Sequence, residues 1–111
     1  MTFGEKLKEL RTGRSLSLRE FCGKHKIDKG NWSRLENGVI PPSTDPEVLG
    51  KVLKAAGLRV GSKAYQEMSD LAYAENGVIP DDLMGDAEFV EYLPKLFDLV
   101  RKNGIKAFNG K

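Results

Sequence analysis

The sequence predicts an all-α fold, in which a bundle of five helices is followed by one or two C-terminal helices. Apolar residues recur at spacings of three and four along most of the 111 residues, which is the period of a helix with one buried face. N-cap residues and glycine stops divide this pattern into short segments. No segment shows the alternation of a half-buried strand. With 40% hydrophobic residues, the chain can bury a modest core.

The first helix is expected from residue 3 to about residue 12. Thr2 and Glu5 stand three positions apart, as in a capping box in which each side chain bonds to the other residue's N–H. The apolar face that follows consists of Phe3, Leu7 and Leu10. A face of this kind holds a helix against the rest of a domain.

Residues 17–42 predict two short helices joined by a tight turn. The first opens with a second capping box at Ser17, and the second opens with the N-cap Asp28 and runs to Glu36. The pair Asn37-Gly38 then supplies a left-handed stop. Two helices joined by so short a turn cross steeply and form a helix-turn-helix unit. In that unit the second helix lies in the major groove of DNA.

A fourth and a fifth helix follow this pair. The fourth is expected from Asp45-Pro46, an N-cap followed by proline at the first helical position, to a stop at Gly57. The fifth is expected from Gly61-Ser62 to Asn76-Gly77. Both carry apolar residues at helical spacing, so both are expected to pack on the core.

The last segment is apolar at helical spacing from Phe89 to Val100. Pro94 lies inside this run, where it removes one backbone donor and disfavours helical geometry at Leu93. We therefore expect a kink or two shorter helices. The apolar stripe has two interpretations: it packs on the fourth and fifth helices as core, or it forms a dimer interface.

The hexapeptide Glu-Asn-Gly-Val-Ile-Pro occurs twice, at residues 36–41 and 75–80. No further similarity exists at the same offset, so we interpret the repeat as two identical helix stops and not as a duplication. In each copy we expect glycine to be left-handed, valine to fold back on the helix and proline to prevent its continuation.

Charge is distributed unevenly along the chain. Residues 1–40 carry nine Lys or Arg and five Asp or Glu, a net of +4, whereas residues 41–111 carry nine and eleven, a net of −2. The basic half contains the helix-turn-helix, as nucleic-acid binding requires. We expect a helix-turn-helix core at 1–58, a helical extension at 59–103 and a flexible tail at 104–111.

Several function classes are disfavoured by composition. Cys22 is the one cysteine, and with His25 it falls short of the four ligands of a structural zinc site. No nucleotide-binding or metalloprotease motif occurs, so we expect no metal, no cofactor and no enzymatic activity. No signal peptide or membrane-spanning run is present, and a cytoplasmic setting without membrane attachment is expected.

The helix-turn-helix positions carry a specific set of side chains. They are Arg11, Ser17, Glu20, Phe21, Cys22, Ile27, Asp28, the run Trp32-Ser-Arg-Leu-Glu-Asn-Gly38, and Pro41. With this set, residues 3 to about 58 resemble the lambda-repressor/Cro-like DNA-binding domains, also called the xenobiotic response element family, which are five-helix bundles. Leu18 and Gly30 depart from that family, which often has a DNA-contacting Gln and a base-reading side chain there. The departures imply base readout that is narrower than usual or rests on fewer residues.

Three side chains on the second helix of the unit are candidates for base contact: Lys29, Asn31 and Arg34. First-turn side chains of a recognition helix point into the groove. Asparagine can pair with adenine, and lysine or arginine with guanine. The alternatives are a solvated Lys29, a local cap role for Asn31, and a surface ion pair of Arg34 with Glu36 or Glu20.

A second group of residues is expected to contact phosphates and so to provide affinity independent of sequence. It consists of Arg14, Ser17, Arg19, Lys26, Ser33, Asn37 and Gly38. Ser17 is at the N-terminus of a helix, where free N–H groups favour an anion, and the loop after Asn37 could offer further N–H groups. The resemblance implies a partly buried structural ion pair between Arg11 and Glu36. The spacing of Trp32 from Leu35 places the indole on the apolar face, in the core.

The sequence therefore predicts a regulator that binds double-stranded DNA at specific sites. A small helix-turn-helix normally needs two copies on a palindromic operator, so a homodimer is expected, and the resemblance implies repression. The alternative is an antitoxin that binds a toxin protein and regulates its own operon. A third reading is a protein-interaction scaffold, because a fold does not fix a function.

Overall fold

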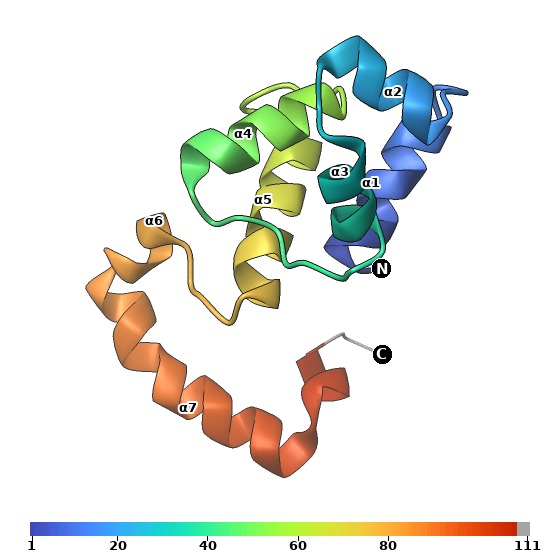
Figure 1. Cartoon of the computed structure of the whole chain (residues 1–111). Helices are drawn as coiled ribbons and strands as arrows, with labels where there is room; N and C mark the ends of the chain where they lie inside the picture. Colours follow the sequence, from blue (N-terminus) through green and yellow to red (C-terminus); the bar gives the residue numbers. More distant parts are fainter. Residues whose placement is uncertain (109–111) are drawn as a thin grey trace. The chain divides into compact units, whose positions relative to one another are not determined.

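The computed structural model describes residues 1–108 and consists of helices and connecting loops (Figure 1). In chain order the helices are α1 (Phe3–Thr12), α2 (Leu18–His25), α3 (Lys29–Glu36), α4 (Pro46–Ala55), α5 (Lys63–Glu75), α6 (Asp81–Met84), α7 (Ala87–Asn103) and a terminal 3-10 turn (Ile105–Phe108). No strand occurs among the described residues. The all-α fold predicted from the sequence is confirmed.

The helices begin where their capping residues stand. At α1 the hydroxyl of Thr2 accepts from the N–H of Glu5 (3.1 Å) and the Glu5 carboxylate accepts from the N–H of Thr2 (2.9 Å). Ser17 and Glu20 make the same reciprocal pair at α2. At α3 the carboxylate of Asp28 accepts from the N–H of Asn31 (2.9 Å). These bonds satisfy N–H groups that the helix itself leaves unpaired.

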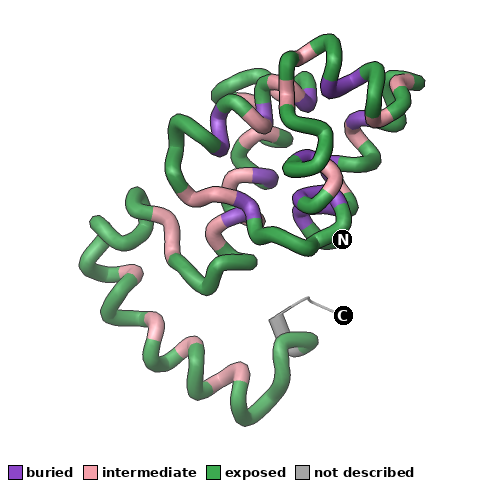
Figure 2. The backbone as a smooth tube through the Cα atoms, viewed as in Figure 1, coloured by how far each residue is buried: buried purple, intermediate pink, exposed green. Residues whose placement is uncertain are grey.

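The chain divides into two compact units, Met1–Val78 and Ile79–Lys111. All of the buried hydrophobic residues belong to the first unit: Phe3, Leu7, Phe21, Cys22, Trp32, Leu35, Leu49, Leu53, Ala56, Met68 and Ala72. Figure 2 shows these buried positions along α1 to α5 and none along α6 and α7. The compact unit thus includes α5 and extends past residue 58, the boundary expected from the sequence.

Helices α1 and α3 come very close together at Gly4. A side-chain carbon at this position would lie 2.4 Å from the carbonyl oxygen of Leu35 and 2.5 Å from that of Glu36. Only glycine allows backbones to come this close. The contact fixes the carboxyl end of α3 against the start of α1.

The two copies of the repeated hexapeptide form the same helix stop. Gly38 and Gly77 have φ values of +72° and +67°. The N–H of Val39 donates to the carbonyl of Arg34 (2.8 Å), and the N–H of Val78 donates to that of Tyr73 (3.0 Å). This bond across five residues is the Schellman pattern, and it agrees with the interpretation of the repeat as a local stop.

Helix α7 runs without interruption from Ala87 to Asn103 with Pro94 inside it. Of the two alternatives expected, a kink or two shorter helices, the second is therefore wrong, and the kink stays a prediction. Proline removes a single donor, and the turns on either side keep their own hydrogen bonds. Of the tail expected at 104–111, residues 105–108 form a 3-10 turn, and residues 109–111 lie outside the described part.

Candidate nucleic-acid interface

Helix α3 presents three exposed polar side chains, two in its first turn and one in its last. Lys29, Asn31 and Arg34 are all exposed, and the Asp28 cap fixes the start of the helix that carries them. Asn31 and Arg34 stand three residues apart and share a face. A guanidinium N–H of Arg34 donates to the side-chain oxygen of Asn31 (3.2 Å). The two side chains therefore form one polar surface that presents both donors and acceptors.

Gly30 makes room for this arrangement. A side-chain carbon on Gly30 would lie 3.4 Å from the Arg34 guanidinium and 3.3 Å from the Asp28 carboxylate. The guanidinium of Arg34 thus lies back along α3, over the position where the resembled family often has a base-reading side chain. The space opened by the missing side chain at residue 30 is used by Arg34.

The alternative ion pairs of Arg34 do not form. The carboxylate of Glu36 bonds to Arg11 and Trp32, and that of Glu20 bonds to the N–H of Ser17. Ion pairs within residues 1–108 join Arg11 to Glu36, Lys63 to Glu67 and Asp98 to Lys102. The positive charges of Lys29 and Arg34 are therefore not neutralised by an ion pair in the described part of the chain.

A buried network lies beneath this surface. The Arg11 guanidinium donates to both carboxylate oxygens of Glu36 (2.7 and 3.0 Å), and its third bond goes to the carbonyl of Leu16 (3.0 Å). The indole N–H of Trp32 donates to the same carboxylate (2.6 Å). The Glu36 carboxylate raises the pKa of Arg11, so the guanidinium stays charged. The network ties α1 to the carboxyl half of α3.

Trp32 is a core residue. Its side chain is 2% exposed, and its ring lies 4.7 Å from that of Phe21 at an angle of 42°. The indole therefore has no face available for stacking on a base. Cys22 is also buried, and burial raises the pKa of its thiol. A thiol with a raised pKa has little thiolate character and is a poor nucleophile.

The N-terminus of α2 presents Ser17 and Arg19, both exposed. The Ser17 hydroxyl oxygen accepts from the N–H of Glu20 and keeps its own proton to donate to a phosphate. The hydroxyl and N–H of Ser17 lower the pKa of Glu20. A phosphate at this end would therefore meet a carboxylate as well as the helix dipole. Arg19 supplies a positive charge next to it.

Two other candidates, Arg14 and the loop after α3, make hydrogen bonds within the chain. Arg14 points its guanidinium at the carboxyl end of α4, where it donates to the carbonyl of Ala55 (3.4 Å). A cation in that place stabilises the negative end of the helix dipole. Arg14 is exposed and also contacts α4, so its contact with phosphate stays a prediction.

The loop after α3 also makes hydrogen bonds within the chain. The side chain of Asn37 donates to the carbonyl (2.9 Å) and the hydroxyl (3.3 Å) of Ser33. The N–H groups of Asn37, Gly38 and Val39 donate to carbonyls of α3. The backbone N–H groups that the sequence suggested for this loop thus already donate within the chain, and the phosphate contact of Gly38 stays a prediction.

Two basic residues of α4 were missed by the sequence reasoning. Lys51 and Lys54 join Lys26, His25 and Ile27 around a cleft of about 480 Å³. The three lysines are exposed. The spacing of Lys51 and Lys54, three residues apart on one helix, was visible in the sequence. Their closeness to Lys26 follows only from the packing of α4 beside the turn between α2 and α3.

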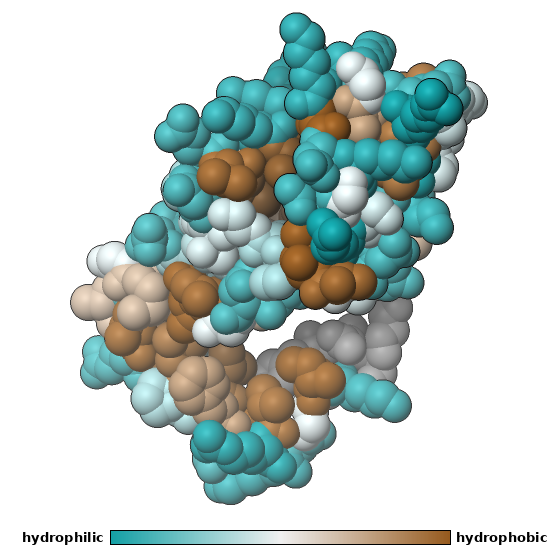
Figure 3. Space-filling model, viewed as in Figure 1, coloured by the Kyte–Doolittle hydropathy of each residue, from teal (hydrophilic) through white to brown (hydrophobic). Residues whose placement is uncertain are grey.

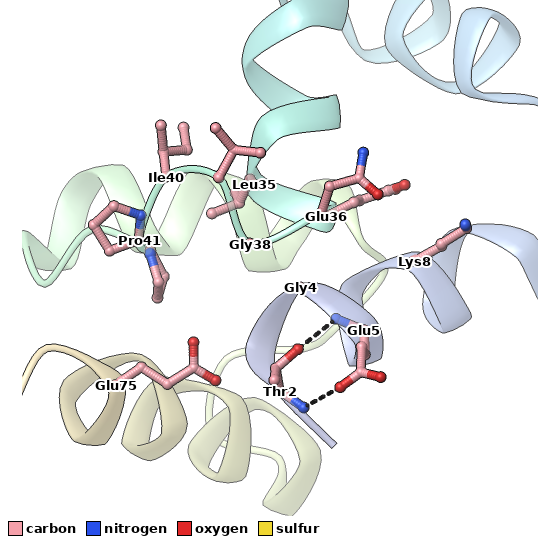
Figure 4. A pocket seen from close by; sticks show the side chains of 13 residues that line it. Thr2, Gly4, Glu5, Lys8, Leu35, Glu36, Gly38, Ile40, Pro41 and Glu75 are labelled. Atoms are coloured by element: carbon pink, nitrogen blue, oxygen red, sulfur yellow. Dashed lines mark hydrogen bonds between the residues drawn. The ribbon is translucent and has the colours of Figure 1, made fainter.

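A further hollow of this unit lies at the other end of α3. It is a groove of about 640 Å³ between the start of α1, residues 35–42 and Glu75. Figure 4 shows the Thr2–Glu5 capping box on one wall and Glu75 of α5 beside it. Lys29, Asn31 and Arg34 do not line this groove. The candidate interface is therefore an exposed surface, which suits a macromolecule better than a small ligand.

A comparison with protein families agrees with this arrangement, since the model of the helix-turn-helix domain matches residues 2–61. The chain belongs to the helix-turn-helix domain family. The match covers α1 to α4 and confirms the resemblance to lambda-repressor/Cro-like domains. No curated protein and no solved structure gave a match.

Membership of the helix-turn-helix family supports DNA binding and the regulation of transcription. Domains of this family are typically binding modules and not enzymes. Within the described residues, no helix combines the length and the apolar character needed to cross a membrane.

Proposed function

We propose that this helix-turn-helix protein binds double-stranded DNA at specific sites and regulates transcription as a homodimer, acting as a repressor. The observation that carries the proposal is the exposed pair of Asn31 and Arg34 on α3, whose side chains are joined by a hydrogen bond. Neither residue takes part in an ion pair among the described residues. This pair could read a base step by presenting a guanidinium to guanine and an amide to adenine.

Lys29 is the third base-contacting residue of the proposal. It precedes Asn31 in the first turn of α3 and is exposed. Phosphate contacts are assigned to Ser17 and Arg19 at the start of α2, and to Lys26 with Lys51 and Lys54 around the cleft beside α4. Ser33 and Asn37 remain candidates through their side chains, although each already bonds to the other.

Selection of bound DNA from a random-sequence duplex pool tests the proposal. At physiological salt the non-specific affinity is weak, so enrichment reports base readout. We expect an enriched palindrome whose half-sites lie about one helical turn apart. Folded protein that enriches no sequence would contradict the proposal.

Replacement of Arg34 by alanine separates base readout from phosphate contact. If Arg34 reads a base, Arg34→Ala should cost about 1–3 kcal/mol and relax the preference at one position of the operator. Arg59→Ala, which removes an exposed arginine from the loop between α4 and α5, is the matched control and should leave the preference unchanged. If instead the affinity falls equally for all sequences and depends less steeply on salt, Arg34 contacts a phosphate and not a base.

An antitoxin role is the alternative proposal. It keeps the DNA-binding surface of α2 and α3 and adds a toxin protein as a partner of the second unit, in which no buried residue occurs among residues 79–106. Co-expression with the products of neighbouring genes tests it. A stable stoichiometric complex that inhibits a toxin would favour this role over that of a simple repressor.

A further inference from the structure

The second unit exposes an unusual amount of apolar surface. Neither α6 nor α7 contains a buried residue. Large apolar side chains are nevertheless frequent there, and the exposed ones are Leu83, Met84, Val90, Tyr92, Phe97 and Ile105. Figure 3 shows hydrophobic side chains gathered over α6 and along α7. A helix with such a surface is normally covered by a partner.

The apolar residues of α7 follow a heptad spacing. Val90, Leu93, Phe97 and Val100 are separated by three, four and three residues, which is the seam of a helix that pairs with another helix. Phe89 and Leu96 flank this seam. In the described structure all six of these side chains are exposed or half-buried. The seam is thus suited to a second helix of similar length.

Charge along this unit is segregated by position. Residues 81–91 contain five acidic residues and no basic ones, a net of −5. Residues 92–106 contain four basic residues and one acidic residue, a net of +3, and that acidic residue, Asp98, is paired with Lys102 (3.1 Å). The start of α7 is therefore negative and its end is positive. A second α7 in the opposite direction would place unlike charges together at both ends.

We infer that the partner of this surface is a second copy of the chain, with the two α7 helices paired antiparallel about a twofold axis near Lys95. This inference rests on the homodimer of the proposed function and names its interface. In the corresponding register Val90 faces Val100 of the second copy, and Leu93 faces Phe97. Glu88 then faces Lys102, and Arg101 comes beside the acidic start of the second α7.

The distribution of charge favours an antiparallel pair of α7 helices over a parallel one. A parallel pair would bring Glu88 and Glu91 beside the same residues of the second copy, and Arg101 beside Arg101. Like charges in contact destabilise a pair. The antiparallel pair is also isologous, because the same patch serves both subunits, and it closes at two chains.

The mass of the full-length protein in solution tests the inference. Sedimentation velocity across a wide range of concentrations should show a dimer for the wild type. Phe97→Glu places a charge in the seam and should raise the dissociation constant about tenfold or more. Its matched control is Tyr92→Glu, since Tyr92 is similarly exposed (49% against 46%) but lies about 200° around the helix from Val90. The control should remain dimeric.

Folding of the first unit provides an internal check on these variants. Neither Phe97 nor Tyr92 belongs to the buried core, so both variants should keep the wild-type fluorescence of Trp32 and its unfolding transition. A wild-type chain that is monomeric at every concentration would overturn the inference. So would dissociation of the Tyr92→Glu control to the same extent as Phe97→Glu.

Two experiments establish direction. The double variant Glu88→Lys with Glu91→Lys reverses the negative end, and in an antiparallel pair this should weaken the dimer about tenfold at low salt and less at high salt. In a parallel pair the double variant would replace repulsion between glutamates by repulsion between lysines, and the stability of the dimer should change little. Chains carrying Val90→Cys should form a disulfide with chains carrying Val100→Cys, and neither should cross-link to itself. Self-cross-linking would overturn the antiparallel arrangement.

The outcomes separate this inference from the proposed function. A monomer that still enriches a DNA sequence would overturn the α7 interface and leave DNA binding in place. An antiparallel dimer that enriches no sequence would support the interface and contradict DNA recognition by α3.

Discussion

The hexapeptide Glu-Asn-Gly-Val-Ile-Pro ends both α3 and α5, and its two copies have the same local geometry in different surroundings. Glycine is left-handed in each, and the valine N–H returns to the helix in each. The asparagine side chain donates to the carbonyl four residues earlier in both, Ser33 in one (2.9 Å) and Ala72 in the other (2.8 Å). The same six residues thus end both helices in the same way.

The glutamates of the two copies have different roles. Glu36 is 6% exposed and binds the guanidinium of Arg11 and the indole of Trp32. Glu75 is exposed and accepts one bond, from the N–H of Phe3 at the start of α1 (2.6 Å). The first is the centre of a buried network, and the second caps another helix from outside. The surroundings, and not the hexapeptide, decide how much each carboxylate contributes to the free energy of unfolding.

Replacement of Glu36 should produce the largest effect. Glu36→Gln leaves the buried Arg11 guanidinium without its counter-charge, and the expected loss is about 3–5 kcal/mol in the free energy of unfolding. Urea denaturation followed by the fluorescence of Trp32, the one tryptophan, measures it.

A double variant identifies the cause. Arg11→Met combined with Glu36→Gln removes the unpaired charge and keeps an oxygen for the Trp32 indole. It should be more stable than the sum of the two single losses predicts. Additive losses would mean that the ion pair carries little of the stability.

Replacement of the two glycines should have equal, intermediate effects. Gly38→Ala and Gly77→Ala each force a side chain into the left-handed region at a cost of about 1–2 kcal/mol. Neither new methyl group would meet a neighbour within 4 Å, so the cost is one of backbone conformation alone. Thermal unfolding of the two variants should give similar shifts. A large difference would show that the stop depends on its surroundings.

Replacement of Glu75 should have a smaller effect than that of Glu36. Glu75→Gln weakens one charge-assisted bond at the surface, and we expect a loss of roughly 0.5–1.5 kcal/mol. The same denaturation measurement compares it with Glu36→Gln. Equal losses for the two variants would contradict the distinction between the buried and the exposed copy.

The smallest effect concerns an exposed carboxylate that only caps its own helix. Bonds from Ser17 lower the pKa of Glu20 below its ordinary value of 4.5. A lowered pKa in the folded state contributes stability above the unfolded pKa and loses it as pH falls through the folded pKa. Glu20→Gln should therefore be slightly less stable than the wild type at neutral pH, and the two should converge in acid. A difference independent of pH would exclude ionisation as its cause.

The same division between local and distant interactions explains what the sequence predicted of the candidate interface. The capping residues Ser17 and Asp28 placed α2 and α3 correctly, because a cap involves residues three positions apart. The sequence could not predict that Arg34 would lie over Gly30, or that Arg14 would turn to α4. Both positions depend on the conformations that these exposed side chains adopt once the helices have packed. For α7 the sequence left open a kinked helix or two shorter ones, since one proline disturbs a helix without necessarily ending it.

The sequence by itself determined where α1 to α5 of this helix-turn-helix protein begin and end, because caps, stops and apolar spacing act within a few residues along the chain. Only the tertiary structure decided which of two identical glutamates is buried, and which lysines gather around the turn between α2 and α3. Within the second unit, it left every residue of α7 exposed or half-buried. Those outcomes depend on distances between segments far apart in the sequence, which local patterns do not encode.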